Sequence, residues 1–264
     1  MVEGILFGQY LPGNSVVHRL DPRTKIFCLL AFAPAVLLAG RWPLYVLLTL
    51  LTLFFIPLAD LPWRVILQAL RPFWLFLLLT FFMQVFFTPG KALWPAFIFR
   101  ATEEGVFLGA LLFWRLTLII ALSSLLTMTT SPLDLTAAVE RLLAPLARAG
   151  LPARELAMMM TVAVCFLPVL LREALTIKKA QQARGADFNS GWPWERLAKT
   201  IPLFVPLFAG AFARAEELAV AMEARGYRLG VRRTRLHPWR FTRRDFAAAG
   251  FAAAVFTLVV LFRA

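Results

Sequence analysis

Charged, catalytic and cross-linking side chains are scarce in this sequence. Only 16% of its 264 residues are Asp, Glu, Lys or Arg, and it has two histidines and two cysteines. His18 and His237 are far apart and have no partner at ligand spacing, which argues against a metal site. Cys28 and Cys165 lie in apolar stretches, as small buried hydrophobic residues do, so we expect no disulfide framework.

The motifs of common hydrolases and nucleotide-binding proteins are missing as well. The chain has no G-x-S-x-G, no Walker loop with its lysine and no H-E-x-x-H. Its acidic residues fall in runs of mixed charge, which is typical of a solvated helix face. We therefore predict no catalytic residue, no metal and no cofactor bound by this chain itself.

Apolar residues, in contrast, dominate the sequence. They make up 60% of the chain, with 25 Phe and a mean hydropathy of +0.73, values typical of an integral membrane protein. We predict an all-α polytopic membrane protein with about five transmembrane helices and further helices on the cytoplasmic side. The expected spans are residues 26–40, 44–59, 73–88, 105–127 and 246–262, with an amphipathic connector at 60–71.

The segment between the fourth and the last span predicts three helices. They run from Ser131 to Gly150, from Pro152 to Arg184 and from Trp194 to Arg225. The chain thus divides into a leader with four spans (1–130), a helical region (131–244) and a last span (245–264). The second and third helices each carry an apolar seam for packing against another helix. The seams are Met160, Val164, Leu167, Leu171 and Ala174, and Phe204, Phe208, Ala211, Ala215, Leu218 and Met222.

The positive charge of the chain is unevenly placed and indicates its orientation. The net charge is +13, and seven arginines without an acid lie between Arg228 and Arg244, where we expect contact with anionic lipid headgroups and not with nucleic acid. With five spans and a cytoplasmic N-terminus, the inner side carries 23 Lys and Arg and the outer side four. Residues 156–171 are apolar enough to span, but a crossing there would move six Lys and Arg of 172–199 outward.

Two segments of the helical region nearly repeat. Ala180–Gly185 and Ala221–Gly226 both read A-x-x-A-R-G, with their arginines 41 positions apart. Glycine readily adopts the left-handed conformation just past a helix end, so Arg184 and Arg225 should lie at helix C-termini. Their guanidinium groups suit a carboxylate partner, and Ala183 and Ala224 leave the backbone accessible. The alternative is ordinary capping by glycine beside a solvated arginine.

A second group of polar residues precedes the first span. Asp21 and Pro22 form an N-cap and first-turn pair, so a helix should begin there. We expect Arg23 and Lys25 to stand at headgroup depth as this helix enters the lipid. The membrane-entry motif comprises His18, Arg19, Asp21, Pro22, Arg23 and Lys25.

One charge lies inside a predicted span. Arg115 is in the fourth span, where a charge is costly and tends to be functional. The alternative is that Arg115 reaches the interface, or pairs with Gln84 or with a glutamate on the outer side. We favour this structural role.

The two A-R-G triplets, together with the entry motif His-Arg-Leu-Asp-Pro-Arg-Thr-Lys, resemble the T component of energy-coupling factor transporters of prokaryotes. The resemblance covers nearly the whole chain. It implies two cytoplasmic ATP-binding-cassette ATPases that bind ATP and Mg, and a small membrane subunit that captures a vitamin or metal ion. It also implies that Arg184 and Arg225 each enter a groove of one ATPase, and that this multi-pass subunit of the cell membrane is not itself an enzyme.

Other functions remain open from the sequence. A T component could serve one substrate, of the cobalt, nickel or biotin type, or be shared among several. A self-sufficient permease would need polar residues along several spans, and none are evident. A lipid-headgroup transferase would need an aspartate-rich pattern around its A-R-G triplet, but Asp187 is the only acid that closely follows Arg184.

Overall fold

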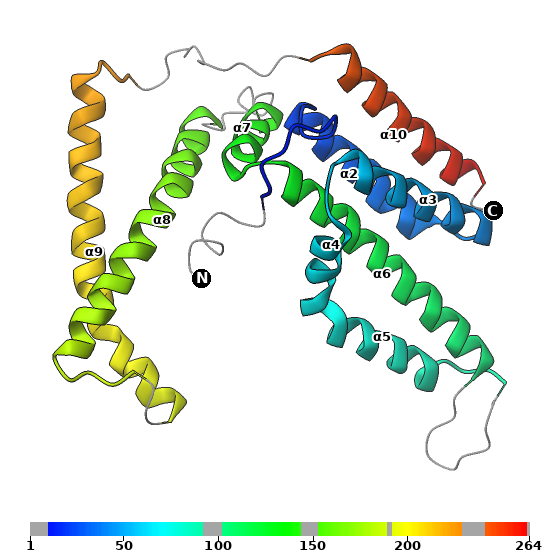
Figure 1. The fold of residues 1–264 in the computed structure, drawn as a ribbon, viewed down its shortest axis with the longest axis horizontal. Coiled ribbons are helices and arrows are strands. Elements are labelled where there is room, and N and C mark those ends of the chain that lie inside the picture. Colours follow the sequence, from blue (N-terminus) through cyan, green and yellow to red (C-terminus); the bar gives the residue numbers. More distant parts are fainter. Residues whose placement is uncertain (1–9, 92–101, 144–152, 189–191, 229–240, 263–264) are drawn as a thin grey trace. The chain divides into compact units, whose positions relative to one another are not determined.

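The computed structural model describes residues 10–91, 102–143, 153–188, 192–228 and 241–262. Their regular elements are all helical (Figure 1), which confirms the all-α prediction. The described residues form two compact units. The bundle unit holds residues 10–131 and 241–262, and the crossed-helix unit holds residues 132–228.

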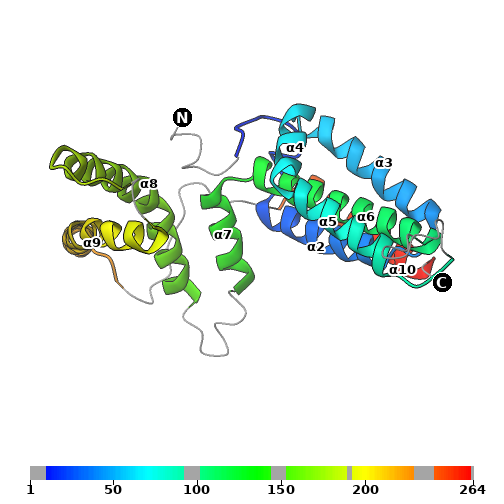
Figure 2. The same ribbon diagram turned by 90° about the horizontal axis from the view of Figure 1, so that it is seen from below.

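In the bundle unit, each predicted span corresponds to one helix (Figure 2). The helices are α2 (Pro22–Leu38), α3 (Trp42–Leu58), α4 (Trp63–Leu70), the 3₁₀ turn η1 (Arg71–Phe73), α5 (Trp74–Phe87), α6 (Glu103–Thr129) and α10 (Arg243–Leu261). The connector at 60–71 is more regular than expected. Its helix α4 continues through η1 directly into α5, because Pro72 occupies the start of η1, where a missing N–H is tolerated.

Several helices are long and apolar enough to cross a membrane. Among the described residues these are Trp63–Phe87, Glu103–Thr129, Glu155–Ala183 and Arg243–Leu261, and α3 is apolar but shorter. These helices are those expected of a polytopic membrane protein. The count of five spans stays a prediction, because length and composition alone also qualify the stretch Glu155–Ala183 of the helical region.

The core of the bundle unit lies where α2, α3, α6 and α10 meet. Leu48, Val36 and Val259 are almost fully buried there. Ala35 of α2 and Ala252 of α10 have no exposed surface, so the two helices approach closely through small side chains. Packing between helices that share an apolar environment depends on such close contact.

Helices α5 and α6 pack through a G-x-x-x-G pair. A Cβ atom on Gly105 would lie 2.8 Å from the carbonyl oxygens of Gln84 and Val85, and one on Gly109 would lie 3.1 Å from that of Phe81. Only glycine therefore permits this backbone separation. The pair explains why this hairpin is closely packed although most α5 side chains face outward.

Two buried aspartates join the first and last helices of the bundle unit. Asp21 caps α2 by accepting from the backbone N of Arg23 at 3.0 Å, and Pro22 follows it, as predicted. Asp245 accepts from the backbone N of Asp21 at 2.7 Å, and from the backbone N and hydroxyl of Thr242 at 2.8 and 2.7 Å. One carboxylate thus caps α10 and ties it to the start of α2.

Lys25 ties the same region to α6. Its Nζ donates to the carbonyl oxygen of Thr129 at 2.7 Å and to Thr130 Oγ1 at 3.3 Å. We expected Lys25 to stand among lipid headgroups, but the side chain is only 7% exposed. The prediction missed that α6 ends beside α2, where its last carbonyls favour a cation. Arg23 lies with its guanidinium carbon 5.3 Å from the ring centre of Phe241.

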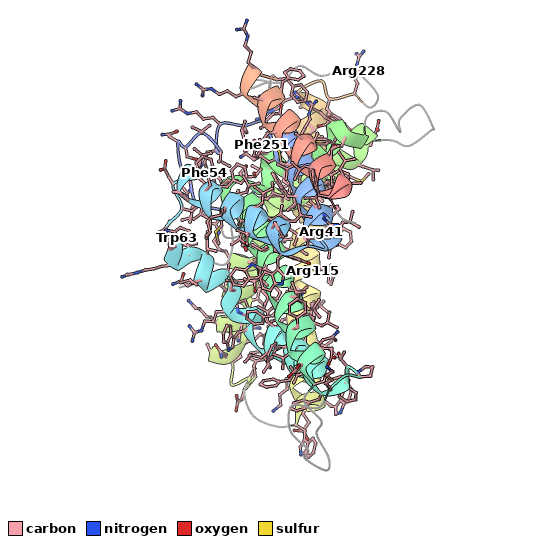
Figure 3. The ribbon with its side chains drawn as sticks, turned by 90° about the vertical axis from the view of Figure 1, so that its right-hand side faces the viewer. Arg41, Phe54, Trp63, Arg115, Arg228 and Phe251 are labelled. Atoms are coloured by element: carbon pink, nitrogen blue, oxygen red, sulfur yellow. The ribbon has the colours of Figure 1, made fainter. Side chains whose placement is uncertain are left out.

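Arg115, labelled in Figure 3, has partners that differ from the predicted ones. Its guanidinium donates to the hydroxyl of Tyr45 and, at 3.2 Å, to the carbonyl oxygen of Ala39 at the end of α2. It also lies 5.7 Å from the ring centre of Tyr45. The proposed partners, Gln84 and the outer glutamates, were therefore wrong. The end of α2 supplies the acceptor, and α3 supplies the aromatic ring.

The crossed-helix unit contains α7 (Pro132–Leu143), α8 (Ala153–Ala183) and α9 (Pro193–Ala224). Helix α7 packs on α8, and α8 on α9. The first helix begins at Pro132 as predicted, whereas its expected end at Gly150 and the next start at Pro152 lie outside the described residues.

The predicted seam of α9 is only partly used within the described structure. Phe204 and Phe208 stack on one another and remain 50% and 57% exposed. The helices meet where Gly210 and Arg214 of α9 face Glu173 of α8. Leu218 and Met222 of the predicted seam line a groove together with Phe166 of α8. The apolar periodicity predicts the part of this contact near Met222, but not the part at Gly210 and Arg214, which involves a charge and a glycine.

The buried tie at Asp245 predicts a stability effect. Asp245→Ala would leave the backbone N–H groups of Asp21 and Thr242 without their acceptor, and should destabilise the protein by about 2 kcal/mol. The thermal unfolding midpoint of the detergent-purified chain measures this. Asp60→Asn removes a carboxylate at an exposed turn with φ 53°, which Asn tolerates, and serves as control. Equal midpoints for the two variants would contradict the tie.

The contact of Arg115 with Tyr45 predicts energetic coupling between the two residues. Tyr45→Phe and Arg115→Met should each destabilise the chain. The double variant should be more stable than the sum of the single effects predicts, by about 1 kcal/mol. A double-mutant cycle of unfolding midpoints measures this coupling. Strictly additive effects would mean that the two side chains act independently.

Candidate functional site

The two A-x-x-A-R-G segments end α8 and α9 with the same cap. Gly185 has φ +89° and Gly226 has φ +75°. After α8, the backbone N of Gly185 donates to the carbonyl of Gln182 at 3.0 Å, and that of Ala186 donates to the carbonyl of Gln181 at 3.0 Å. This pair of bonds defines a Schellman motif.

The end of α9 repeats this hydrogen-bond pattern. The backbone N of Gly226 donates to the carbonyl of Glu223 at 2.8 Å, and that of Tyr227 donates to the carbonyl of Met222 at 3.0 Å. The sequence-based prediction that Arg184 and Arg225 lie at helix C-termini is confirmed. Each arginine is the last residue before a left-handed glycine, so the two guanidinium groups leave equivalent backbone positions.

Both helix ends are accessible. Ala183, Arg184 and Gly185 are exposed, as are Ala224, Arg225 and Gly226. A Cβ atom added to Gly185 or Gly226 would meet nothing within 4 Å, so neither glycine is required by crowding. We call these two exposed triplets, 183–185 and 224–226, the arginine tips. Among the described residues, neither arginine of the tips makes an ion pair.

The two tips belong to one crossed pair of helices. Arg214 of α9 lies 3.1 Å from the carboxylate of Glu173 on α8. At the same crossing, Gly210 lies against the carboxylate of Glu173, since a Cβ added to it would be 2.6 Å from Glu173 Oε1. Figure 1 shows that α8 and α9 run in opposite directions through this crossing, which leaves the tips at opposite ends of the pair.

The side chains around the two tips differ in charge. Lys178 and Lys179 precede the first tip, and Lys178 lies 6.0 Å from the ring centre of Phe188. Glu223 precedes the second tip, beside an apolar groove lined by residues of both helices, including Phe166 and Met222. The tips share their backbone geometry, but their electrostatic surroundings are distinct.

The entry motif forms a separate polar cluster in the bundle unit. His18 Nε2 donates to the carbonyl of Leu11 at 3.0 Å, and its Nδ1 is hydrogen-bonded to the Ser15 hydroxyl at 2.7 Å. The carbonyl of His18 in turn accepts from Lys25 at 3.3 Å. Arg19 is exposed. These hydrogen bonds hold the residues before α2 against the start of α2 and the end of α6.

Sequence reasoning missed the central member of this cluster. Asp245 was assigned to the last span without a role, although Thr242 precedes it by three residues, the spacing of a capping box. That signal could have identified it as a cap but not as the partner of Asp21. In the part of the chain that the structure describes, no group of three or more His, Cys, Asp or Glu could hold a metal ion.

Comparison with known proteins gives matches over nearly the whole chain. A family model described as CbiQ, cobalt transport protein, matches residues 13–236. An energy-coupling factor transporter transmembrane protein, EcfT, of Acidaminococcus fermentans is 44% identical over 263 residues, which cover 100% of this chain and 98% of that protein.

Two further proteins that carry the same name are similar to this chain. That of Brevibacillus brevis is 45% identical, covering 99% of this chain and 97% of its own length. That of Bacillus subtilis is 40% identical with the same coverage, 99% and 97%. Identity of this extent, together with the family-model match, shows that the chain belongs to the family of transmembrane T components of energy-coupling factor transporters.

Proposed function

We propose that the two arginine tips are the sites at which this T component engages two cytoplasmic ATPase subunits of the ATP-binding-cassette type. The observation that carries the proposal is the duplicated Schellman cap, which presents Arg184 and Arg225 from equivalent, exposed positions. A planar guanidinium favours bidentate binding of carboxylates, so each socket would be acidic. ATP and Mg would be bound by the ATPases.

The arrangement of α8 and α9 supports a mechanical role. Tips at opposite ends of a crossed pair suit two separate partner subunits better than one. The ion pair between Glu173 and Arg214 links the two helices at the crossing, where Gly210 also lies against the Glu173 carboxylate. A displacement of one tip by ATPase closure would therefore be transmitted through the crossing to the other helix and onward into the membrane. The chain itself would catalyse no reaction.

This role requires both tips on the cytoplasmic side. We propose a cytoplasmic N-terminus, five spans (α2, α3, α5, α6 and α10), and α7–α9 at the inner face of a prokaryotic cell membrane. Helix α8 is long and apolar enough to span. However, its crossing would carry the six Lys and Arg of residues 172–199 outward, against the positive-inside rule.

The remaining partner would be a small membrane subunit that captures the substrate. Helix α9 presents an exposed apolar stripe for it, with Val205 70% and Phe212 72% exposed. The description of the matching family model names cobalt, whereas the names of the Acidaminococcus and Brevibacillus relatives mention no substrate. We therefore assign substrate selectivity to the partner subunit, and not to this chain.

Removal of the tip arginines tests the proposal. Arg184→Ala and Arg225→Ala should each lower ATP-driven uptake by reconstituted complex at least about tenfold, since truncating one side of a buried charge pair costs about 2 kcal/mol or more. The double variant should be lower still and should lose the ATPase subunits on co-purification. Uptake into proteoliposomes and the subunit content of the purified complex are the readouts.

The matched control is Arg228→Ala, which removes an exposed arginine just beyond the second tip. It should leave uptake and assembly unchanged. Arg184→Lys and Arg225→Lys keep the charge but lose the bidentate fork, so they should fall between wild type and Ala. Full uptake by the double Ala variant would overturn the proposal.

A further inference from the structure

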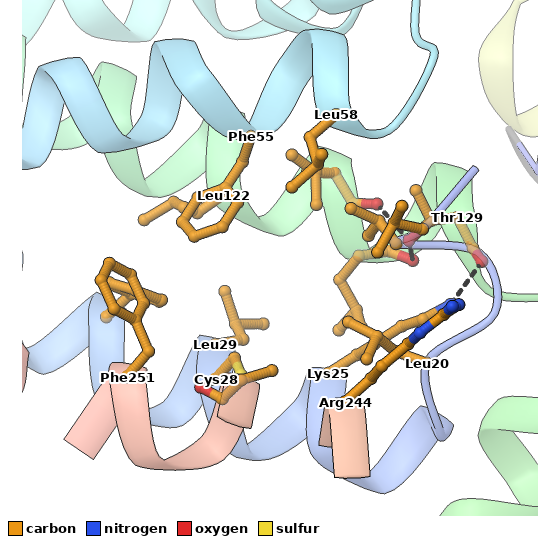
Figure 4. Close-up of a pocket in the computed structure, with 16 residues that line it drawn as sticks. Leu20, Lys25, Cys28, Leu29, Phe55, Leu58, Leu122, Thr129, Arg244 and Phe251 are labelled. Carbon is orange, nitrogen blue, oxygen red and sulfur yellow. Dashed lines mark hydrogen bonds between the residues drawn. The ribbon is translucent and has the colours of Figure 1, made fainter. Parts of the chain in front are cut away.

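An apolar cavity lies inside the bundle unit, between α2, α3, α6 and α10 (Figure 4). Its volume is about 190 Å³. The rings of Phe32, Phe55 and Phe251 line one end, with centroid separations of 5.8, 6.2 and 6.4 Å. The three rings come from three different helices, α2, α3 and α10, and together they close that end of the cavity.

The opposite end of the cavity is cationic. Lys25 and Arg244 both line the cavity, and Figure 4 shows their side chains toward this end, away from Phe251. Lys25 is held in place by its bond to the carbonyl of Thr129 at 2.7 Å. Arg244 is exposed, and it makes no ion pair with the residues that the structure describes.

The chemistry of the cavity defines its occupant. Eleven of the sixteen lining residues are Leu, Val or Phe, so most of the wall offers water no hydrogen bond. An engineered apolar cavity of about 150 Å³ stays dry and binds small hydrocarbons. The exposed cation Arg244 at one end favours an anionic group there. A hydrocarbon chain attached to an anionic group satisfies both ends of the cavity.

The surrounding sequence identifies the source of such a ligand. Arg244 ends a run of seven arginines without an acid that begins at Arg228, and it lies in the first turn of the apolar helix α10. This position suits the headgroup level of a membrane. We propose that the cavity receives a segment of one acyl chain of an anionic phospholipid from the bilayer, whose phosphate contacts Arg244 at the end of the cavity that Lys25 also lines.

The test uses the full-length chain in its purified complex. The complex is delipidated in mild detergent, exposed to equal amounts of dioleoyl phosphatidylglycerol and dioleoyl phosphatidylcholine, and analysed by native mass spectrometry. One phosphatidylglycerol should be retained per chain, in preference to phosphatidylcholine by about fivefold, as expected for one cation near the phosphate. Oleic acid is offered in a parallel experiment.

Three variants separate the two ends of the cavity. Arg244→Gln should abolish the preference for phosphatidylglycerol while some lipid is still retained. Ala248→Phe adds a ring to the cavity wall and should lower retention of both phospholipids. Arg243→Gln is the matched control, because Arg243 has the same charge and is the adjacent exposed residue but does not line the cavity. It should behave as wild type.

A native thiol gives a second measurement that does not depend on these variants folding. Cys28 lines the cavity, whereas Cys165 is exposed and is replaced by Ser. Phosphatidylglycerol should slow modification of Cys28 by methyl methanethiosulfonate more than phosphatidylcholine does. The proposal is overturned if no phospholipid is retained, if the two phospholipids are retained or protect Cys28 equally, or if oleic acid replaces them.

Discussion

Every α-helix ends with carbonyl groups that lack partners inside the helix, and this chain resolves that constraint in the same way at α8 and at α9. In both places a glycine adopts the left-handed backbone conformation, and two backbone N–H groups beyond the helix donate hydrogen bonds to carbonyls of its last turn. The cap fixes the direction in which the preceding arginine leaves the helix. The equivalence of Arg184 and Arg225 is thus a property of the backbone, and needs no support from neighbouring side chains.

The bundle unit depends on a related principle, because its buried charges are placed where helix ends supply partners. Asp245 serves the start of α10 and the start of α2 at once. Lys25 binds the last carbonyls of α6, and Arg115 reaches the carbonyl of Ala39 at the end of α2. Polar groups in an apolar bundle are tolerated where they meet such unpaired backbone groups. These contacts join helices that are far apart in the chain and leave their outer faces apolar.

Much of this arrangement could be predicted from local sequence signals. Asp21 with Pro22, Ser131 with Pro132, and the two A-R-G triplets each contain their own start or stop signal, and the helices begin or end there. The parts that could not be predicted depend on which helices become neighbours. Lys25 was assigned to the lipid headgroups, and Arg115 to Gln84 or an outer glutamate. Both assignments failed because the actual acceptors lie at helix ends distant in sequence. Phe204 and Phe208 were assigned to a packing seam, but Gly210 and Arg214 form the observed crossing with Glu173.

The central claim is that both arginine tips face the cytoplasm, where a motor outside this chain can reach them. Single cysteines at Ala183 and Ala224, in a chain whose Cys28 and Cys165 are replaced, test it through labelling with a membrane-impermeant maleimide. Both positions should react in inside-out vesicles, and neither should react in intact cells until the membrane is permeabilised. Reaction of either position from the outer side of intact cells would contradict it.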